Sequence, residues 1–98
     1  MKPYAFHPAA DAEYAAAATY CAGADSELGV RFYDEMERLI REVRQQPERS
    51  WMFDPPVRCH RSTAFPYAIV YLDKPDRIWI VAVMHGKQRP GYWRGRLG

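Results

Sequence analysis

The chain has 98 residues, of which 48% are hydrophobic and 27% are charged, a composition typical of one globular domain with one modest core. Its formal net charge is only +2, and its two cysteines, which form no CxxC pair, are too few for a disulfide or metal framework. The longest apolar stretches, such as residues 78–84, are too short to cross a bilayer, and the first residues lack the apolar run of a signal peptide. We therefore expect a single cytoplasmic domain over residues 1–98.

The charges are distributed unevenly along the chain. Residues 1–50 contain six Lys or Arg and nine Asp or Glu, a balance of −3, whereas residues 51–98 contain eight and three, a balance of +5. Aromatic residues are interleaved with the basic residues of the second half, namely Tyr67, Tyr71, Trp79, Tyr92 and Trp93. This pattern suits an anionic partner, although a solvated basic face would explain the same charges.

The N-terminal part of the sequence predicts a short strand and then a helix. Residues 4–7 alternate just long enough for an edge strand, and Pro8 suits the first turn of a helix. Residues 9–22 are rich in alanine, the strongest helix former, and Gly23 predicts the end of the helix. The apolar face of this helix is narrow and consists of Tyr14, Ala17, Ala18 and Cys21.

A second helix is predicted over residues 26–46. Asp25 and Ser26 are candidate N-caps, and Pro47 limits the helix at its other end. The apolar stripe of this segment comprises Leu28, Phe32, Met36, Leu39, Ile40 and Val43. Because the link between the two helices is short, they should form an antiparallel hairpin.

After Pro47 the hydrophobic period changes from 3.6 to 2, which predicts strands. We expect strands over residues 57–61, 65–72 and 77–85, with a turn at residues 73–76. In the second strand Phe65, Tyr67, Ile69 and Tyr71 should share one face, with Ala68, Val70 and Leu72 on the other. In the third strand Ile78, Ile80, Ala82 and Met84 should share one face, with Trp79, Val81 and Val83 on the other. Both faces of this third strand are apolar, so it should lie inside the sheet.

The predicted order is β-α-α-β-β-β, an α+β fold in which a helical hairpin covers one face of a small antiparallel sheet. The other face of the sheet should then be partly open. Residues 86–98 form a basic and aromatic C-terminal segment. We expect the open face or its rim to carry the functional site.

Several segments, taken in order, resemble the toxins of the RelE/ParE superfamily. They are Tyr4-x-Phe-x-Pro-Ala, Glu13-Tyr14, Leu28-Gly29-x-x-Phe32, Pro47, Val57-Arg58, Phe65-Pro66-Tyr67-x-Ile69-x-Tyr71, Ile80-x-Ala82-Val83-x-His85 and Arg89-Pro90-x-Tyr92-Trp93-x-x-Arg96. The resemblance covers nearly the whole chain, and the Phe-Pro-Tyr segment and the ending are closer to the ParE-like and plasmid-stabilisation branch.

The resemblance implies the fold derived above and a function in a type II toxin–antitoxin system. It implies a cognate antitoxin as partner, and hence a toxin–antitoxin hetero-oligomer. It also implies one of two targets, because ParE-like members inhibit DNA gyrase whereas RelE-like members cut messenger RNA on the ribosome. Within this superfamily the fold does not determine the target.

A nuclease would need groups that move protons and positive charge that stabilises the phosphorane. His85, Arg89 and Tyr92 are the candidate catalytic residues under that reading, since an unperturbed imidazole titrates near neutral pH. Candidate residues for contacting a target or nucleic acid are Arg58, Arg61, Arg89, Trp93, Arg94 and Arg96. Against a nuclease, residues 58–61 contain no lysine, whereas RelE-like nucleases carry several lysines and arginines in that region.

The same residues have plain structural interpretations. His85 ends a strand and can cap it, Tyr92 and Trp93 can pack the C-terminal segment onto the sheet, and Arg94 and Arg96 can be solvated. Cys59 and His60 are adjacent, but without further ligands they predict no metal site, and no cofactor is expected. We rank a gyrase inhibitor without chemistry of its own first, a ribosome-dependent endoribonuclease second and a degenerate antitoxin-binding module third.

Overall fold

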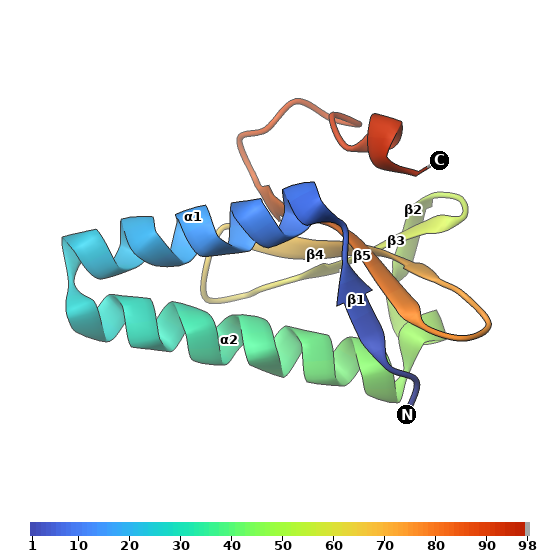
Figure 1. Ribbon diagram of the computed structural model, residues 1–98, viewed down its shortest axis with the longest axis horizontal. Coiled ribbons are helices and arrows are strands. Elements are labelled where there is room, and N and C mark those ends of the chain that lie inside the picture. Colours follow the sequence, from blue (N-terminus) through green and yellow to red (C-terminus); the bar gives the residue numbers. More distant parts are fainter. Residues whose placement is uncertain (98) are drawn as a thin grey trace.

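The computed structural model describes residues 1–97 and confirms the α+β architecture (Figure 1). Its elements in chain order are β1 (Tyr4–Phe6), α1 (Pro8–Ala24), α2 (Ser26–Gln45), the 3-10 turn η1 (Pro47–Arg49), β2 (Trp51–Asp54), β3 (Val57–Arg61), β4 (Tyr67–Asp73), β5 (Ile78–His85) and the 3-10 turn η2 (Arg94–Arg96). Among the residues described, no helix is long and apolar enough to cross a membrane.

The five strands form one sheet in the order β1-β5-β4-β3-β2. Strands β2 to β5 pair in antiparallel fashion, as expected for the C-terminal half, but β1 runs parallel to β5. The sheet is therefore mixed at this edge. At the opposite edge lies β2, a strand that the sequence analysis did not predict. Strand β5 lies inside the sheet, between β1 and β4, as its apolar character indicated.

The two helices pack against one face of the sheet as an antiparallel hairpin (Figure 1). Helix α1 runs past Gly23 to Ala24, and the Asp25 side chain caps α2 by accepting a hydrogen bond from the backbone N–H of Glu27 at 2.9 Å. A Cβ atom added at Gly29 would lie 2.7 Å from the Ala22 Cβ, so glycine lets the two helices approach closely at this position. Most of the predicted apolar stripe of α2 is buried in the core between the helices and the sheet. Its buried residues are Phe32, Met36, Leu39, Ile40 and Val43.

The second face of the sheet is covered by the C-terminal segment and is not open as expected. Trp93 is fully buried there, and its ring centroid lies 5.6 Å from that of Phe53 on β2. This second core is composed of Val57, Cys59, Ala68, Val70, Leu72, Val81, Ala82 and Trp93. Gly91, in this segment, has a positive φ of 76°, a conformation that favours glycine.

A β-bulge changes which side chains of β5 share a face. Tyr71 pairs with Ile80 but Val70 pairs with Ala82, so Val81 is the extra residue. Beyond Val81, the alternation of β5 side chains between the two faces of the sheet shifts by one residue. Val83 consequently lies in the helix-side core with Ile78 and Ile80, whereas Ala82 joins Val81 on the opposite face. The predicted faces of β5 were therefore wrong after Val81, while those of β4 were correct.

Candidate target-binding surface

Five of the candidate site residues come from the C-terminal segment, and four of them make internal contacts. Trp93 is fully buried, so it cannot contact a partner in this conformation. Arg94 donates to the Asp54 carboxylate on β2 at 2.9 and 3.1 Å. Tyr92 and Arg96 both bind the carboxylate of Glu13 on α1. These side chains hold the segment in place, and they do not form a shared binding surface.

Glu13 is the acceptor that joins three parts of the fold. Its carboxylate accepts hydrogen bonds from the Tyr92 hydroxyl at 2.9 Å, from the Arg96 guanidinium at 2.9 and 3.0 Å, and from the Val83 backbone N–H at 3.0 Å. Arg96 also donates to the Val81 carbonyl oxygen at 3.0 Å. Because β1 pairs with β5 only as far as Ile80, these side chains satisfy the edge of β5 where β1 has ended. Burial, together with the bond to Glu13, raises the pKa of the Tyr92 hydroxyl.

His85 and Arg89 lie at the end of β5 and just beyond it. The His85 Nδ1 accepts a hydrogen bond from the Lys87 backbone N–H at 3.0 Å. The His85 ring packs edge-on against the Tyr67 ring, with their centroids 4.9 Å apart. Arg89 is exposed. Tyr92, the third residue of the candidate catalytic set, is bound to Glu13 instead. The structure thus places His85 and Arg89 in one region without assembling the catalytic set around them.

The two arginines of β3 lie at opposite ends of that strand. Arg58 donates to the carbonyl oxygens of Glu48 and Ser50 at 3.0 and 2.9 Å, so it supports η1 and the start of β2. Arg61 is exposed and pairs in the sheet with Ala68, which itself pairs with Met84. It is therefore near the same end of the sheet as His85. Residues directly paired across strands share a face, so Arg61 lies on the face of Ala68 whereas His85 lies on that of Tyr67.

Arg61 borders a groove between the C-terminal end of α2 and the β2–β3 edge. The groove has a volume of about 860 Å³ and is lined by Glu42, Gln45, Gln46, Arg49, Ser50, Trp51, Cys59, His60 and Arg61. The groove exists because Trp51, the first residue of β2, pairs with Cys59 of β3. His60 and Arg61 therefore extend past the start of β2 and have no partner on that strand. The indole of Trp51 is 61% exposed at its margin.

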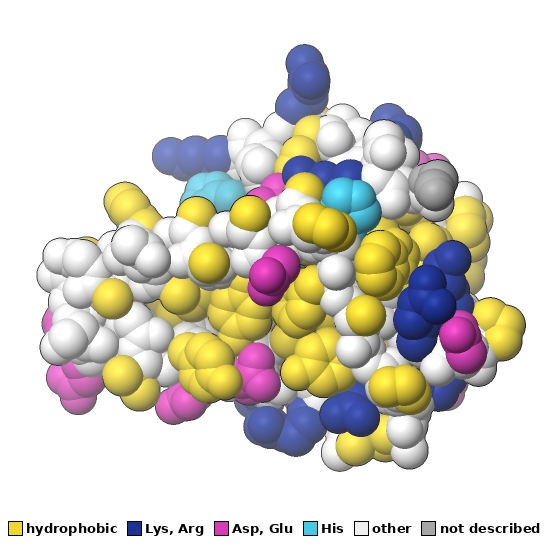
Figure 2. All heavy atoms as spheres, in the orientation of Figure 1, with side chains coloured by type: hydrophobic (Ala, Val, Ile, Leu, Met, Phe, Trp, Pro, Cys, Tyr) yellow, Lys and Arg dark blue, Asp and Glu magenta, His cyan; other side chains and the backbone are white. Residues whose placement is uncertain are grey.

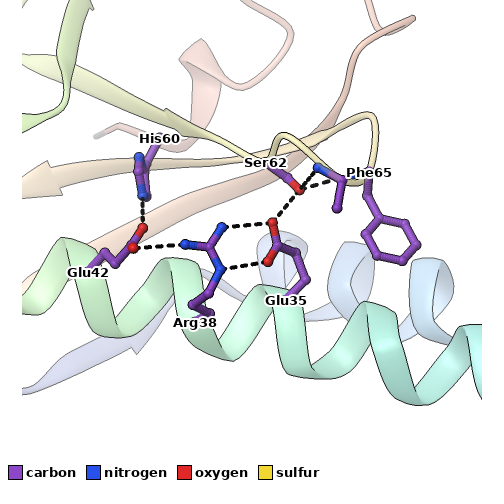
Figure 3. Close-up of polar contacts among 7 residues, drawn as sticks. Glu35, Arg38, Glu42, His60, Ser62 and Phe65 are labelled. Atoms are coloured by element: carbon purple, nitrogen blue, oxygen red, sulfur yellow. Dashed lines mark hydrogen bonds and ion pairs between the residues drawn. The ribbon is translucent and has the colours of Figure 1, made fainter.

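A polar network connects α2 to β3 beside this groove (Figure 3). Arg38 binds Glu35 through two nitrogens at 2.7 and 2.9 Å and Glu42 at 2.8 Å. Glu42 also contacts the His60 Nε2 at 2.8 Å, and the Ser62 hydroxyl donates to Glu35 at 2.6 Å. The bonds from Arg38 lower the pKa of Glu35, and the bond with His60, followed by the charge of Arg38, lowers that of Glu42. Every side chain of the network has an internal partner, which indicates a structural role.

Neither metal nor thiol chemistry is indicated by the residues that the structure describes. They contain no cluster of three His, Cys, Asp or Glu side chains that could hold a metal ion. Cys21 and Cys59 are both buried free thiols, and burial raises the pKa of Cys59. A raised pKa reduces the thiolate fraction, so this thiol is a poor nucleophile.

The sequence analysis named only Cys59, His60 and Arg61 of the groove, and it missed Arg49 and Trp51 among the others. Both come from the segment after Pro47, where no strand was predicted because the strand has only four residues and two prolines follow it. Exposed aromatic residues beside arginines are a signal that could have drawn attention to residues 49–51. The groove itself could not be predicted, because it depends on which residue of β3 lies opposite the first residue of β2.

Comparisons with known proteins agree with the fold and with the resemblance in the sequence. The family model described as "ParE toxin of type II toxin-antitoxin system, parDE" matches residues 4–90. A solved structure described as "Chromosomal ParDE TA system from P. aeruginosa" shares the fold with a TM-score of 0.74, at 15% identity over 87% of this chain and 96% of that chain. No curated protein matches the chain in sequence. Because the family match spans most of the chain, this protein belongs to the ParE toxin family of type II toxin–antitoxin systems.

Proposed function

We propose that this toxin inhibits DNA gyrase by binding and performs no chemistry of its own. The observation that carries the proposal is that one of the three candidate catalytic residues makes an internal hydrogen bond. The Tyr92 hydroxyl, which a nuclease would need beside His85 and Arg89, is bound to Glu13 on α1 at 2.9 Å. A general acid or base must reach the reacting atoms within hydrogen-bond distance. Arg61 and Arg89 remain as exposed cations that can contact an acidic protein surface.

A ribosome-dependent endoribonuclease is the second candidate function. One observation favours it: the half-buried His85 ends β5 and the exposed Arg89 follows four residues later, and a histidine and an arginine can together move a proton and bind a phosphate. A degenerate toxin that serves only as an antitoxin-binding module is the third candidate. Toxicity on expression separates this last alternative from the first two.

The first test compares His85→Ala, Arg89→Ala and Arg61→Ala in two assays. A gyrase inhibitor should leave messages intact, induce a DNA-damage response and inhibit supercoiling by purified gyrase. Arg89→Ala and Arg61→Ala should then weaken inhibition roughly tenfold or more, with His85→Ala nearly silent. Trp93 is a poor probe, since its burial means that Trp93→Ala would disturb the fold. If His85→Ala alone abolishes toxicity and messages are cleaved by the unaltered toxin, the nuclease reading replaces this proposal.

We also propose that a small acidic antitoxin covers exposed apolar surface on the helical hairpin. Tyr20, Val30 and Tyr33 are 77%, 60% and 53% exposed, and Tyr33 stacks on Tyr14 at 6.2 Å. Figure 2 shows hydrophobic side chains across the face formed by the two helices, with Asp and Glu side chains among them and along the lower left, and Lys and Arg side chains toward the lower and right margins. An amphipathic segment with acidic flanks would complement such a surface.

Expression of the toxin alone should therefore stop growth, and co-expression with the antitoxin gene should restore it. Tyr33→Asp should weaken antitoxin binding, because it places a carboxylate in an apolar contact and opposite acidic side chains. Asp34→Asn changes the next residue of α2 without adding a charge to the apolar surface, and should leave binding unchanged. Unimpaired growth at high soluble expression would support the degenerate module.

A further inference from the structure

We propose that the groove between α2 and the β2–β3 edge binds a nucleoside phosphate unit. In this arrangement the base stacks on the Trp51 indole and the phosphate lies between Arg49 and Arg61. The unit could be a free nucleotide or one residue of a single-stranded nucleic acid. The inference does not depend on gyrase as the target.

The shape of the groove fits a ligand of this size. Its volume of about 860 Å³ is within the range of small-molecule sites, which is roughly 300–1,000 Å³. The Trp51 side chain is 61% exposed at its margin. Its ring packs on Phe53, with centroids 5.3 Å apart, and Phe53 packs in turn on the buried Trp93. The indole is therefore an exposed aromatic surface on a firm base, as base stacking requires.

Neither arginine of the groove has an acidic partner among the residues that the structure describes. Arg49 donates only to the amide oxygen of Gln46, at 2.8 Å, and Arg61 is exposed with no ion pair to any residue that the structure describes. By contrast, Arg38, Arg94 and Arg96 each bind a carboxylate. Guanidinium groups bind phosphate through two parallel hydrogen bonds. Two such groups in one groove leave positive charge that an anion would neutralise.

The carboxylate that lines the groove is held by other side chains. Glu42 accepts a hydrogen bond from Arg38 at 2.8 Å through one oxygen and contacts the His60 Nε2 at 2.8 Å through the other, within the network of Figure 3. Gln45 and Ser50 supply an amide and a hydroxyl in the same groove, and such groups can bind the edge of a base or a ribose hydroxyl. Aromatic, cationic and neutral polar groups therefore occur together, and a nucleoside phosphate uses all three.

The proposal is tested by calorimetric titration of the whole protein with AMP, adenosine, ribose 5-phosphate and a six-residue oligodeoxythymidylate. AMP should bind, and adenosine and ribose 5-phosphate should bind at least about tenfold more weakly, since each lacks one half of the recognised unit. Trp51→Ala and Arg61→Gln should each weaken AMP binding by about tenfold, whereas Trp51→Tyr should retain most of the affinity. If nucleic acid is the source, the oligonucleotide should bind more tightly than AMP and lose affinity steeply with added salt. If free nucleotide is the source, AMP should bind at least as tightly as the oligonucleotide.

Arg31→Gln is the matched control, because it removes the same charge from an exposed position near the start of α2, outside the groove. It should leave AMP affinity unchanged. Circular dichroism should show that every variant remains folded. The proposal is overturned if neither AMP nor the oligonucleotide binds, or if Trp51→Ala and Arg61→Gln bind AMP as tightly as the unaltered protein does.

Discussion

Glu13 is the side chain that ties the last segment of the chain to the sheet. It receives hydrogen bonds from Tyr92 and Arg96 of the C-terminal segment and from the backbone of Val83 on β5. The Glu13 and Arg96 side chains are only 20% and 18% exposed, so their ion pair is shielded from solvent. Breaking a shielded pair costs more than breaking a surface pair, because the remaining charge keeps too few partners.

We predict that Glu13→Gln lowers the free energy of unfolding by about 1–3 kcal/mol. Glutamine keeps the size of the side chain but cannot form the ion pair with Arg96, and its amide nitrogen cannot accept a hydrogen bond. Urea unfolding followed by tryptophan fluorescence measures the change. Asp34→Asn is the control, since this exposed carboxylate has no hydrogen bond or ion pair to any described residue and its substitution should have little effect. Equal stability of both variants would contradict the assigned role of Glu13.

At the residue scale, the sequence showed which side chains have the chemistry for binding, but not where the fold places them. Trp93, Arg94 and Arg96 were candidate binding residues because they are aromatic and basic, yet the structure uses each of them within the fold. Their partners, Asp54 and Glu13, lie 40 and 83 residues away along the chain. No local pattern encodes such pairings. The alternative interpretation of the tail, that Tyr92 and Trp93 pack it onto the sheet, was confirmed.

At the scale of elements, the network of Figure 3 joins the middle of α2 to the end of β3. It contains two carboxylates, Glu35 and Glu42, whose pKa values are lowered by hydrogen bonds and by the charge of Arg38. A carboxylate with a lowered folded-state pKa stabilises the protein above its unfolded pKa, which is about 4.3 for Glu. That stabilisation is lost as the pH falls through the lower folded-state values.

We therefore predict that the free energy of unfolding decreases as the pH falls below about 4.3, and that Arg38→Gln makes this decrease smaller. Without Arg38, the pKa of Glu35 returns toward its ordinary value, so folded and unfolded states bind protons more equally. Urea titrations between neutral and acidic pH measure the slope. Arg31→Gln removes the same charge from a position on α2 with no carboxylate partner among the described residues, and should keep the slope of the unaltered protein. Identical slopes for all three proteins would contradict the prediction.

Element positions followed closely from the periodicity of the sequence, because both helices and the strands β3, β4 and β5 bury regular apolar patterns. Two features did not follow. The bulge at Val81 reverses the faces of β5 and depends on its register with β4. Strand β2 is short, and its Trp51 and Met52 are exposed, so its pattern differs from that of a half-buried strand. Register and edge pairing are tertiary properties, and these were the parts of the fold that a single sequence left undetermined.

At the scale of the whole molecule, the sheet is covered on both faces, by the hairpin on one side and by residues 86–97 on the other. The second core depends on Trp93, the largest fully buried side chain. Truncating a buried tryptophan to alanine costs about 3–5 kcal/mol, which is a large part of the 5–15 kcal/mol typical of a whole domain. The C-terminal segment is thus part of the folded unit.

We predict that a chain ending at His85 does not form a stable monomer. Loss of the C-terminal segment would expose the apolar side chains of Val57, Val70 and Val81 together on one face of the sheet. Contiguous apolar surface of that kind promotes association. Size-exclusion chromatography should show aggregates, and limited proteolysis should degrade the truncated chain faster than the full chain. Full-length Arg94→Gln is the control, because it removes only an exposed pair with Asp54, with 63% and 38% of the two side chains accessible, and such pairs contribute little. A truncated chain that is monomeric and as resistant to protease as the full chain would show that the hairpin and sheet are a sufficient folding unit without the segment that covers them.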